Sequence, residues 1–216
     1  VETGEKVPIG VGNLDGLLSG GFDRGVVTSV CGPPGSGKTT FGILLALACL
    51  RSGPVAFLDS EGGLSAERIL QIGPKADLKR ILLKRIFDFR SQEKVVLALS
   101  KQKCSAIIVD SIVHNYRLLL TDRTAREVNL RLSAQIAELN KIASEKNIPV
   151  LVTGHTYRKK DGEIGLAGGA VMEYLPKTIV LLEKTGEGKR QAIIYKSRSL
   201  PEGKTAEFSV VEKGFA

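Results

Sequence analysis

The stretch GPPGSGKTT, residues 32–40, has a composition that no packed helix or strand favours. It carries three glycines and two prolines, and it ends in a lysine followed by two threonines. Gly32, Gly37, Lys38 and Thr39 satisfy the spacing G-x-x-x-x-G-K-[ST], in which backbone amides cradle phosphate oxygens. The spacing therefore predicts a phosphate-binding loop, and the alternative is a chance glycine turn before a helix.

The segments on either side supply the context that such a loop requires. Residues 25–31 (GVVTSVC) are typical of a buried strand, and residues 39–50 (TTFGILLALACL) are typical of an apolar helix. Glycines let N–H groups approach the phosphates, and the helix start adds its dipole. We expect Lys38 to reach the β- and γ-phosphates of ATP and Thr39 to bind Mg²⁺. The predicted nucleotide-binding residues of this loop are Gly32, Pro33, Pro34, Gly35, Ser36, Gly37, Lys38, Thr39 and Thr40.

Length and composition fit one α/β domain spanning residues 1–216. No apolar run is long enough to span a bilayer and no leader is evident, so we expect a soluble protein without a membrane partner. Three cysteines, Cys31, Cys49 and Cys104, lie in apolar surroundings and favour a reducing cytoplasm. The net charge of +8 favours anionic partners such as nucleic acid.

Strands and helices alternate along most of the chain. We expect strands at 54–59, 81–87, 105–110 and 148–153, and helices from about Ser65, at 91–103 and at 128–146. Three later strands, at 177–184, 190–197 and 205–213, are joined by short turns. The pattern predicts a mostly parallel sheet flanked by helices, with antiparallel strands at the C-terminal end. Residues 1–10 are expected to be a loose lead-in.

Asp110 is the second candidate residue of the nucleotide site. It ends an apolar strand, at the edge where open α/β sheets bind ligands. There its carboxylate can hold Mg²⁺ together with Thr39. The alternative is a helix cap formed by Asp110 and Ser111.

Glu61 is the third candidate. The segment FLDSEGGLSAERI places Asp59 and Glu61 at the end of the strand that follows the phosphate loop. A carboxylate there can orient or deprotonate an attacking water, with Lys38 as the charge that faces the phosphates. A small-molecule kinase would need an acceptor pocket and a lid, so hydrolysis is the better interpretation.

In this order, GPPGSGKTT, FLDSEGGLSAERI and AIIVDSI resemble the ATPase core of the RecA-family recombinases, and more closely its archaeal branch. The similarity covers nearly the whole chain. It implies a RecA-like P-loop fold, Glu61 as the catalytic carboxylate and Arg68 over the adenine ring, where a guanidinium can stack. The alternative for Arg68 is an exposed helix charge. A KaiC-like ATPase of the RecA fold is a further alternative that the DSEGG and ERI segments make less fitting.

The chain also departs from the pattern of that family. Full-length archaeal recombinases carry an N-terminal DNA-binding domain and a Phe-x-x-Ala segment, so we expect a paralogue consisting of the core alone. Where recombinases have an Asn-Gln pair, this sequence has Gly154 and His155. His155 is a candidate γ-phosphate sensor because it can donate a hydrogen bond, and the alternative is an ordinary buried histidine. His114 is expected to be structural.

Two segments, residues 116–127 and 156–167, correspond to the family's DNA-facing loops. The second places a basic run beside an aromatic ring, which suits phosphate contact and base stacking. The alternative is a solvated hairpin with scattered charge. The candidate DNA-binding residues are Arg117, Arg123, Tyr157, Arg158, Lys159 and Lys160.

Together these features and the resemblance predict an ATP- and Mg²⁺-binding ATPase that binds single-stranded DNA, with junction DNA as a further candidate, and assists homologous recombination at the cytoplasmic nucleoid. The resemblance implies the main archaeal recombinase and a junction-resolving nuclease as partners. The rival hypothesis is a regulatory module that binds nucleotide as a switch, hydrolyses little and acts through those protein contacts.

Overall fold

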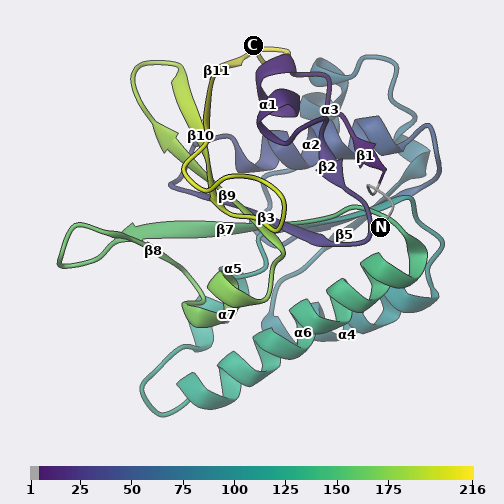
Figure 1. Cartoon of the computed structure of the whole chain (residues 1–216). Coiled ribbons are helices and arrows are strands. Elements are labelled where there is room, and N and C mark those ends of the chain that lie inside the picture. The colour runs from purple at the N-terminus through teal and green to yellow at the C-terminus, as the bar shows by residue number, and fades with distance from the viewer. Residues whose placement is uncertain (1–4) are drawn as a thin grey trace.

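A twisted ten-stranded sheet runs through the computed structural model, which describes residues 5–216 (Figure 1). Its strands follow the order β12-β11-β10-β9-β3-β7-β6-β4-β5, and β8 pairs with β7. A separate pair is formed by β1 and β2. The strands are β1 (Lys6–Val7), β2 (Phe22–Asp23), β3 (Val27–Gly32), β4 (Val55–Asp59), β5 (Ile81–Arg85), β6 (Ala106–Asp110), β7 (Val150–Arg158), β8 (Ile164–Leu166), β9 (Thr178–Lys184), β10 (Lys189–Lys196), β11 (Thr205–Val211) and β12 (Gly214–Phe215).

The centre of the sheet is parallel and its C-terminal side is antiparallel. Every pairing from β9 through β3, β7, β6 and β4 to β5 is parallel. The pairings of β9 with β10, β10 with β11 and β11 with β12 are antiparallel. The predicted fold class, a RecA-like α/β sheet with antiparallel strands at its C-terminal end, is confirmed.

Helices cover both faces of the sheet (Figure 1). The helices are α1 (Gly12–Leu17), α2 (Lys38–Cys49), α3 (Ala66–Ile72), α4 (Phe89–Ala98), α5 (His114–Leu119), α6 (Ala125–Lys146) and α7 (Ala170–Tyr174). Phe57 and Ile108 pack on the side of α1, α2 and α3, whereas their neighbours Leu58 and Val109 pack on the side of α4 and α6. This alternation is the period of two that a strand buried on both faces requires.

Local sequence explains where these helices begin and how closely they pack. Ser65 accepts a hydrogen bond from the Arg68 amide at 3.1 Å and so caps α3, as its type and position favour. Gly42 lies in α2 where a Cβ would meet Ile108 at 3.0 Å, so the missing side chain lets α2 approach β6. The long helix α6 buries Leu132 and Ile136, on the apolar face that the sequence predicts.

Residues 5–10 do not form the loose lead-in that the sequence predicts; residues 1–4 lie outside the described part of the chain. Val7 and Ile9 are each 6 % exposed and belong to the core beside α1 and α2. The amides of Ile9 and Gly10 donate to the Asp15 carboxylate at 2.8 and 2.9 Å. Alternating apolar side chains and a carboxylate that accepts two amide hydrogen bonds fix this segment.

The strand predicted at residues 81–87 is shorter than expected. It ends at Arg85, and Phe87 is 82 % exposed. Asp88 caps α4 by accepting from the Ser91 amide at 2.8 Å, so the chain must already turn at Phe87.

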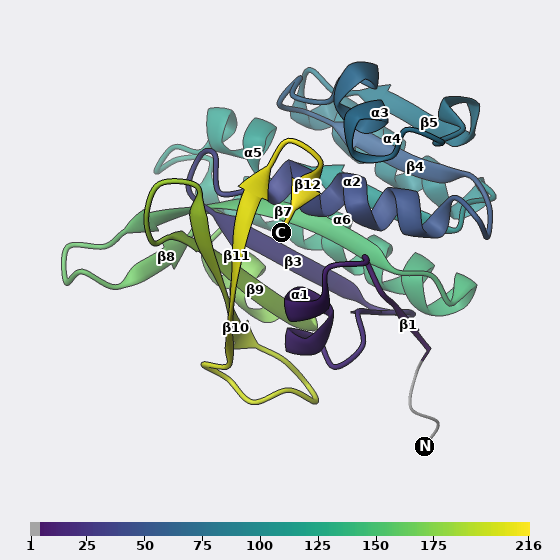
Figure 2. The ribbon, with the colours of Figure 1, turned by 90° about the horizontal axis from the view of Figure 1, so that it is seen from above.

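Aromatic packing joins the phosphate-loop helix to both ends of the chain. Phe41 of α2 is 1 % exposed, and its ring lies 6.3 Å from Phe22, 5.9 Å from Phe208 and 4.9 Å from Phe215, centroid to centroid. Seen from above, β11 and β12 run beside α2 (Figure 2). Edge-to-face contacts of this kind add to the stabilisation that comes from burying the rings.

We predict that Phe41→Ala lowers the free energy of unfolding by about 3–5 kcal/mol, because it leaves a cavity among three rings. The matched control is Phe87→Ala, which removes the same ring from an exposed position. Chemical denaturation of both variants measures the difference. Equal midpoints for the two variants would contradict the packing role of Phe41.

Candidate nucleotide and DNA site

The carboxyl ends of β3, β4, β6 and β7 meet at one edge of the sheet because these strands are parallel neighbours. The phosphate loop follows β3 at this edge and leads directly into α2. Gly35 has φ +69° and Gly37 has φ +104°, in the left-handed region that glycine adopts without strain. In the described chain no side chain caps α2, so the amides of its first turn are left for a ligand.

The phosphate loop is held from outside by the C-terminal strands. Nε and Nη2 of Arg190, on β10, donate to the Gly35 carbonyl oxygen at 3.3 and 3.1 Å. A Cβ on Gly37 would lie 2.9 Å from the Phe215 ring, so Phe215 packs directly on the loop. The chain from 205 to 215 therefore buttresses the predicted phosphate site.

Lys38 is the buried cation of the loop. It is 6 % exposed, and its Nζ donates to the carbonyl oxygens of Gly32 and Pro33, at 3.0 Å each. Burial lowers the pKa of Lys38, and the charges of Glu61 and Asp110 partly oppose that shift. A desolvated ammonium bonded only to neutral carbonyls is well suited to pair with phosphate oxygens.

Thr39 and Asp110 are in direct contact, as the sequence predicts. Thr39 Oγ1 donates to Asp110 Oδ2 at 2.6 Å, and Thr153 Oγ1 donates to Asp110 Oδ1. Asp110 is 2 % exposed, and this burial raises the pKa of its carboxyl group, against the effect of the two hydroxyls. The helix-cap alternative is not favoured, because both carboxylate oxygens face hydroxyl groups of other elements.

This hydroxyl–carboxylate pair fits a magnesium ion shared with a nucleotide. Residues 5–216 contain no group of three or more His, Cys, Asp or Glu side chains that could hold a metal ion unaided. Mg²⁺ keeps several waters and phosphate oxygens, so one carboxylate and one hydroxyl are enough on the protein side. Thr39 and Asp110 provide that oxygen set beside the loop.

Asp59 shapes the loop that carries Glu61. Its Oδ1 accepts from the Gly62 amide at 2.8 Å, and its Oδ2 accepts from the Leu64 amide at 3.1 Å. Ser60 Oγ donates to the Ser111 carbonyl oxygen at 2.7 Å, which ties the ends of β4 and β6 together. Asp59 therefore holds the conformation of this loop from a buried position, and Glu61 is the carboxylate that remains accessible at the edge of the sheet.

Glu61 is hydrogen-bonded to His155. Nε2 of His155 donates to Oε1 of Glu61 at 2.7 Å. This hydrogen bond, followed by the charges of His155 and Lys38, lowers the pKa of Glu61 against the opposing effect of burial. Two residues that the sequence predicts separately, a catalytic carboxylate and a sensor histidine, thus form one pair.

Arg68 lies at the side of the phosphate loop, next to the C-terminal hairpin. Its Nη1 donates to the Glu212 carbonyl oxygen at 2.6 Å and to Gln71 Oε1 at 2.5 Å. Phe215, three residues after Glu212, contacts Gly37 of the loop. The stacking role of Arg68 on adenine stays a prediction.

The basic segment of residues 156–167 is a β-hairpin. Strand β7 continues to Arg158 and pairs antiparallel with β8, and the ribbon projects from the body in both overall views (Figures 1 and 2). Tyr157 is 54 % exposed, and Arg158, Lys159 and Lys160 are exposed beside it. Lys159 pairs with Glu163 at 3.2 Å, an exposed contact that costs little to exchange for a phosphate.

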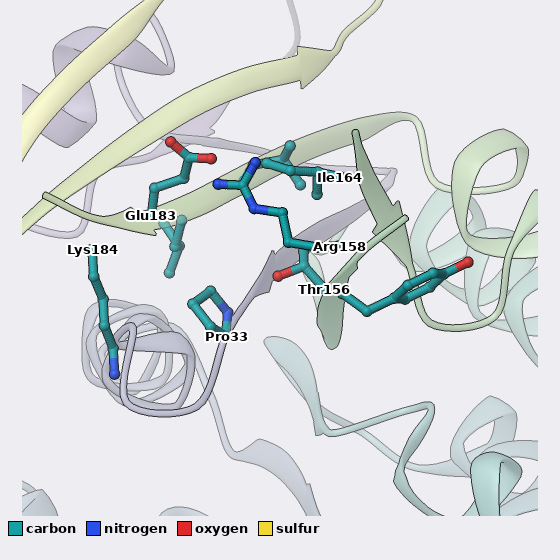
Figure 3. Close-up of a pocket in the computed structure, with 9 residues that line it drawn as sticks. Pro33, Thr156, Arg158, Ile164, Glu183 and Lys184 are labelled. Carbon is teal, nitrogen blue, oxygen red and sulfur yellow. The ribbon is translucent and has the colours of Figure 1, made fainter. Parts of the chain in front are cut away.

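A cavity of about 300 Å³ separates this hairpin from the phosphate loop. Arg158 extends from the hairpin side, and Pro33 and Lys184 lie on the loop side (Figure 3). The nucleotide candidates and the DNA candidates are therefore neighbours on one face.

The other predicted DNA-facing segment, residues 116–127, is mostly helical. Residues up to Leu119 belong to α5, and α6 begins at Ala125. Tyr116 is buried at 3 % exposure, and its hydroxyl donates to Asn129 Oδ1 at 2.6 Å. Arg117 and Arg123 remain exposed on this segment, and Arg117 lines a cavity together with Tyr157 of the hairpin.

The family comparison agrees with this geometry. A family model described as Rad51 matches residues 5–216. The chain belongs to the Rad51 family. Among curated members, the DNA repair and recombination protein RadB of Methanococcoides burtonii is 41% identical over 214 residues, covering 93% of each chain. RadB of Thermoplasma volcanium is 36% identical, over 98% of this chain and 92% of its own.

A solved structure of the Rad51 family is also similar over almost its whole length. The crystal structure of the RadB recombinase is 33% identical in sequence, with a TM-score of 0.83, and the match covers 97% of this chain and 98% of that one. The resemblance to the archaeal RecA-type core is thus confirmed. In residues 5–216 of this Rad51-family chain, no helix is both long and apolar enough to cross a membrane.

Sequence reasoning missed four contributors to the site in this Rad51-family chain. They are Thr153 on Asp110, Ser60 on Ser111, Arg190 on Gly35 and Phe215 on Gly37. Thr153 could have been found, because it is the last residue of the strand predicted at 148–153, at the same edge as Asp110. Arg190 and Phe215 gave no signal, because antiparallel strands far along the chain bring them to the loop.

We predict that His155→Ala raises the pKa of Glu61, because the hydrogen bond that stabilises the ionised carboxylate is lost while the desolvation remains. Carbon-detected NMR titration of the Glu61 carboxyl group measures the shift. His114→Ala is the matched control and should move the pKa less, because His114 acts only through its charge. An unchanged Glu61 pKa in His155→Ala would contradict the hydrogen bond.

Proposed function

We propose that this chain is an ATPase of the RecA type that binds Mg·ATP and DNA and assists DNA repair by homologous recombination. The observation that carries the proposal is the convergence of Lys38, the Thr39–Asp110 pair and Glu61 at one edge, beside an exposed basic hairpin. Its similarity to RadB proteins supports the recombination role. The family match also favours this function over that of a KaiC-like ATPase.

The residues divide the work of phosphoryl transfer as follows. The loop amides and Lys38 bind and orient the phosphates, and Arg68 lies on the side proposed for the base. Thr39 and Asp110 would hold Mg²⁺, which would supply positive charge to the phosphates. Glu61 is ionised, so it can orient a water and accept its proton.

The hairpin is the proposed DNA contact. Exposed cations at Arg158, Lys159 and Lys160 can reach backbone phosphates, and the Tyr157 ring, which packs on Gly165 of β8, can stack on a base with its exposed part. Arg117 and Arg123 add positive charge from the neighbouring segment. Single-stranded and junction DNA both present such phosphates, and the proposed place of action is the cytoplasmic nucleoid.

A second candidate function is a nucleotide-dependent switch with little hydrolysis, acting through the main recombinase or a junction-resolving nuclease. The observation that favours it is the low basicity of Glu61, because a carboxylate already hydrogen-bonded to His155 is a weaker proton acceptor. Turnover measurements distinguish the two functions directly.

We expect Glu61→Gln to keep its ATP affinity and to lose at least about a hundredfold in kcat, because only the transition state loses an interaction. Lys38→Ala should instead lose ATP binding in calorimetric titration while the circular dichroism spectrum is kept. Glu145→Gln, at the exposed far end of α6, is the matched control. Parent-like turnover in Glu61→Gln would favour the nucleotide-dependent switch. Parent-like ATP affinity in Lys38→Ala would contradict the assignment of the nucleotide-binding site.

We expect removal of Arg158, Lys159 and Lys160 to flatten log K against log salt for single-stranded DNA by roughly two units, at about 0.7 per phosphate contact. Tyr157→Ala should weaken binding by ~1–3 kcal/mol and leave that slope almost unchanged. The control removes Lys75, Lys79 and Lys141, which are exposed away from the hairpin. Fluorescence anisotropy across a salt series gives both quantities, and identical slopes for the two triple variants would reject the hairpin.

A further inference from the structure

His155 occupies the point where β7 leaves the parallel sheet and enters the hairpin. Its Cα is paired with Gly32, the first residue of the phosphate-loop motif. Its carbonyl oxygen accepts from the Ala167 amide at 2.8 Å, just beyond β8. The backbone of His155 is therefore fixed between the phosphate loop and the root of the hairpin.

Glu61, by contrast, is on a loop and has a long side chain. Its side chain is 28 % exposed, against 14 % for His155. A glutamate loses considerable rotamer entropy when it is held in one position, so a single strong partner decides where its carboxylate lies. The 2.7 Å bond from His155 Nε2 to Glu61 Oε1 is that partner.

Other charges surround Glu61 without bonding it. The charges of Lys38 and His114 stabilise the ionised carboxylate of Glu61 without a hydrogen bond. The charge of Glu61 in turn helps to raise the pKa of Asp110. Within residues 5–216 the only side-chain hydrogen bond to the Glu61 carboxylate comes from His155. It engages Oε1, so Oε2 is left to receive a water.

We propose that His155 is a positioning residue for ATP hydrolysis: it holds Oε1 of Glu61 from the root of the DNA hairpin and leaves Oε2 to orient the attacking water. The inference rests on the proposed ATPase function. It assigns the histidine to the carboxylate, whereas the resemblance in sequence suggests a contact with the γ-phosphate.

The test compares three variants for ATP turnover and for nucleotide affinity. His155→Ala should lower kcat about ten- to a hundredfold, the loss expected when a reacting group is no longer held in place, with the ATP-to-ADP affinity ratio unchanged. His155→Gln, whose amide Nε2 can donate at similar reach, should restore most of the rate. His155→Met fills the space without a donor and should behave as His155→Ala, so the comparison stands even if the alanine variant unfolds.

A double-mutant cycle distinguishes this role from a γ-phosphate contact. In the Glu61→Gln background, His155→Ala should cost less than about twofold more, because the residue it positions is already disabled. An equal, additive loss in that background overturns the inference, as does a changed ATP-to-ADP affinity ratio with kcat kept. His114→Ala is the matched control, and a loss as large as that of His155→Ala would also count against the specific bond.

The outcomes also distinguish this inference from the proposed function. Turnover that depends on Lys38 and Glu61 but is indifferent to all three His155 variants overturns the inference alone. A parent protein without turnover, or with turnover that Lys38→Ala leaves unchanged, overturns the ATPase function and the positioning role with it.

Discussion

Parallel pairing at the centre of the sheet is the constraint on which the site depends. The register of β4 with β6 sets Asp59 opposite Asp110, and the register of β3 with β7 sets Gly32 opposite His155. Each of these strands runs from a buried apolar stretch to a polar or glycine residue at the same edge. Backbone hydrogen bonding thus brings together groups that lie far apart in the chain.

Around that edge, the carboxylate side chains differ in the internal hydrogen bonds that they accept. Asp59 is fully occupied by backbone amides, Asp110 by two hydroxyls, and Glu61 by a single histidine. Asp59 and Asp110 each have two internal partners and are almost fully buried, whereas Glu61 has one and is more exposed, which leaves it with the most freedom to meet a ligand. This difference separates residues that hold the scaffold from the residue that is available for chemistry.

Much of this could be predicted from the sequence, because its strongest signals are local. The phosphate loop, Asp110 and the apolar face of α6 follow from spacing and periodicity, and the strands that carry them lie where expected. The pairing of Glu61 with His155 could not be predicted, because 94 residues separate them and they meet only through the pairing of β4 with β6 and of β6 with β7. The defined conformation of residues 5–10 could not be predicted either, since two apolar side chains in a short polar segment give no periodic pattern.

The projecting ribbon of β7 and β8 has a consequence for how the molecule can vary. Its tip, residues 159–163, is exposed, and two-stranded ribbons are marginally stable when nothing packs on them. The conformation of the ribbon is therefore set at its root, where Leu166 is buried. The exposed tip contributes little to the stability of the fold. Length and charge at the tip can change without cost to the core, so natural selection and protein engineering can alter what this ribbon contacts while the edge that carries the phosphate loop stays unchanged.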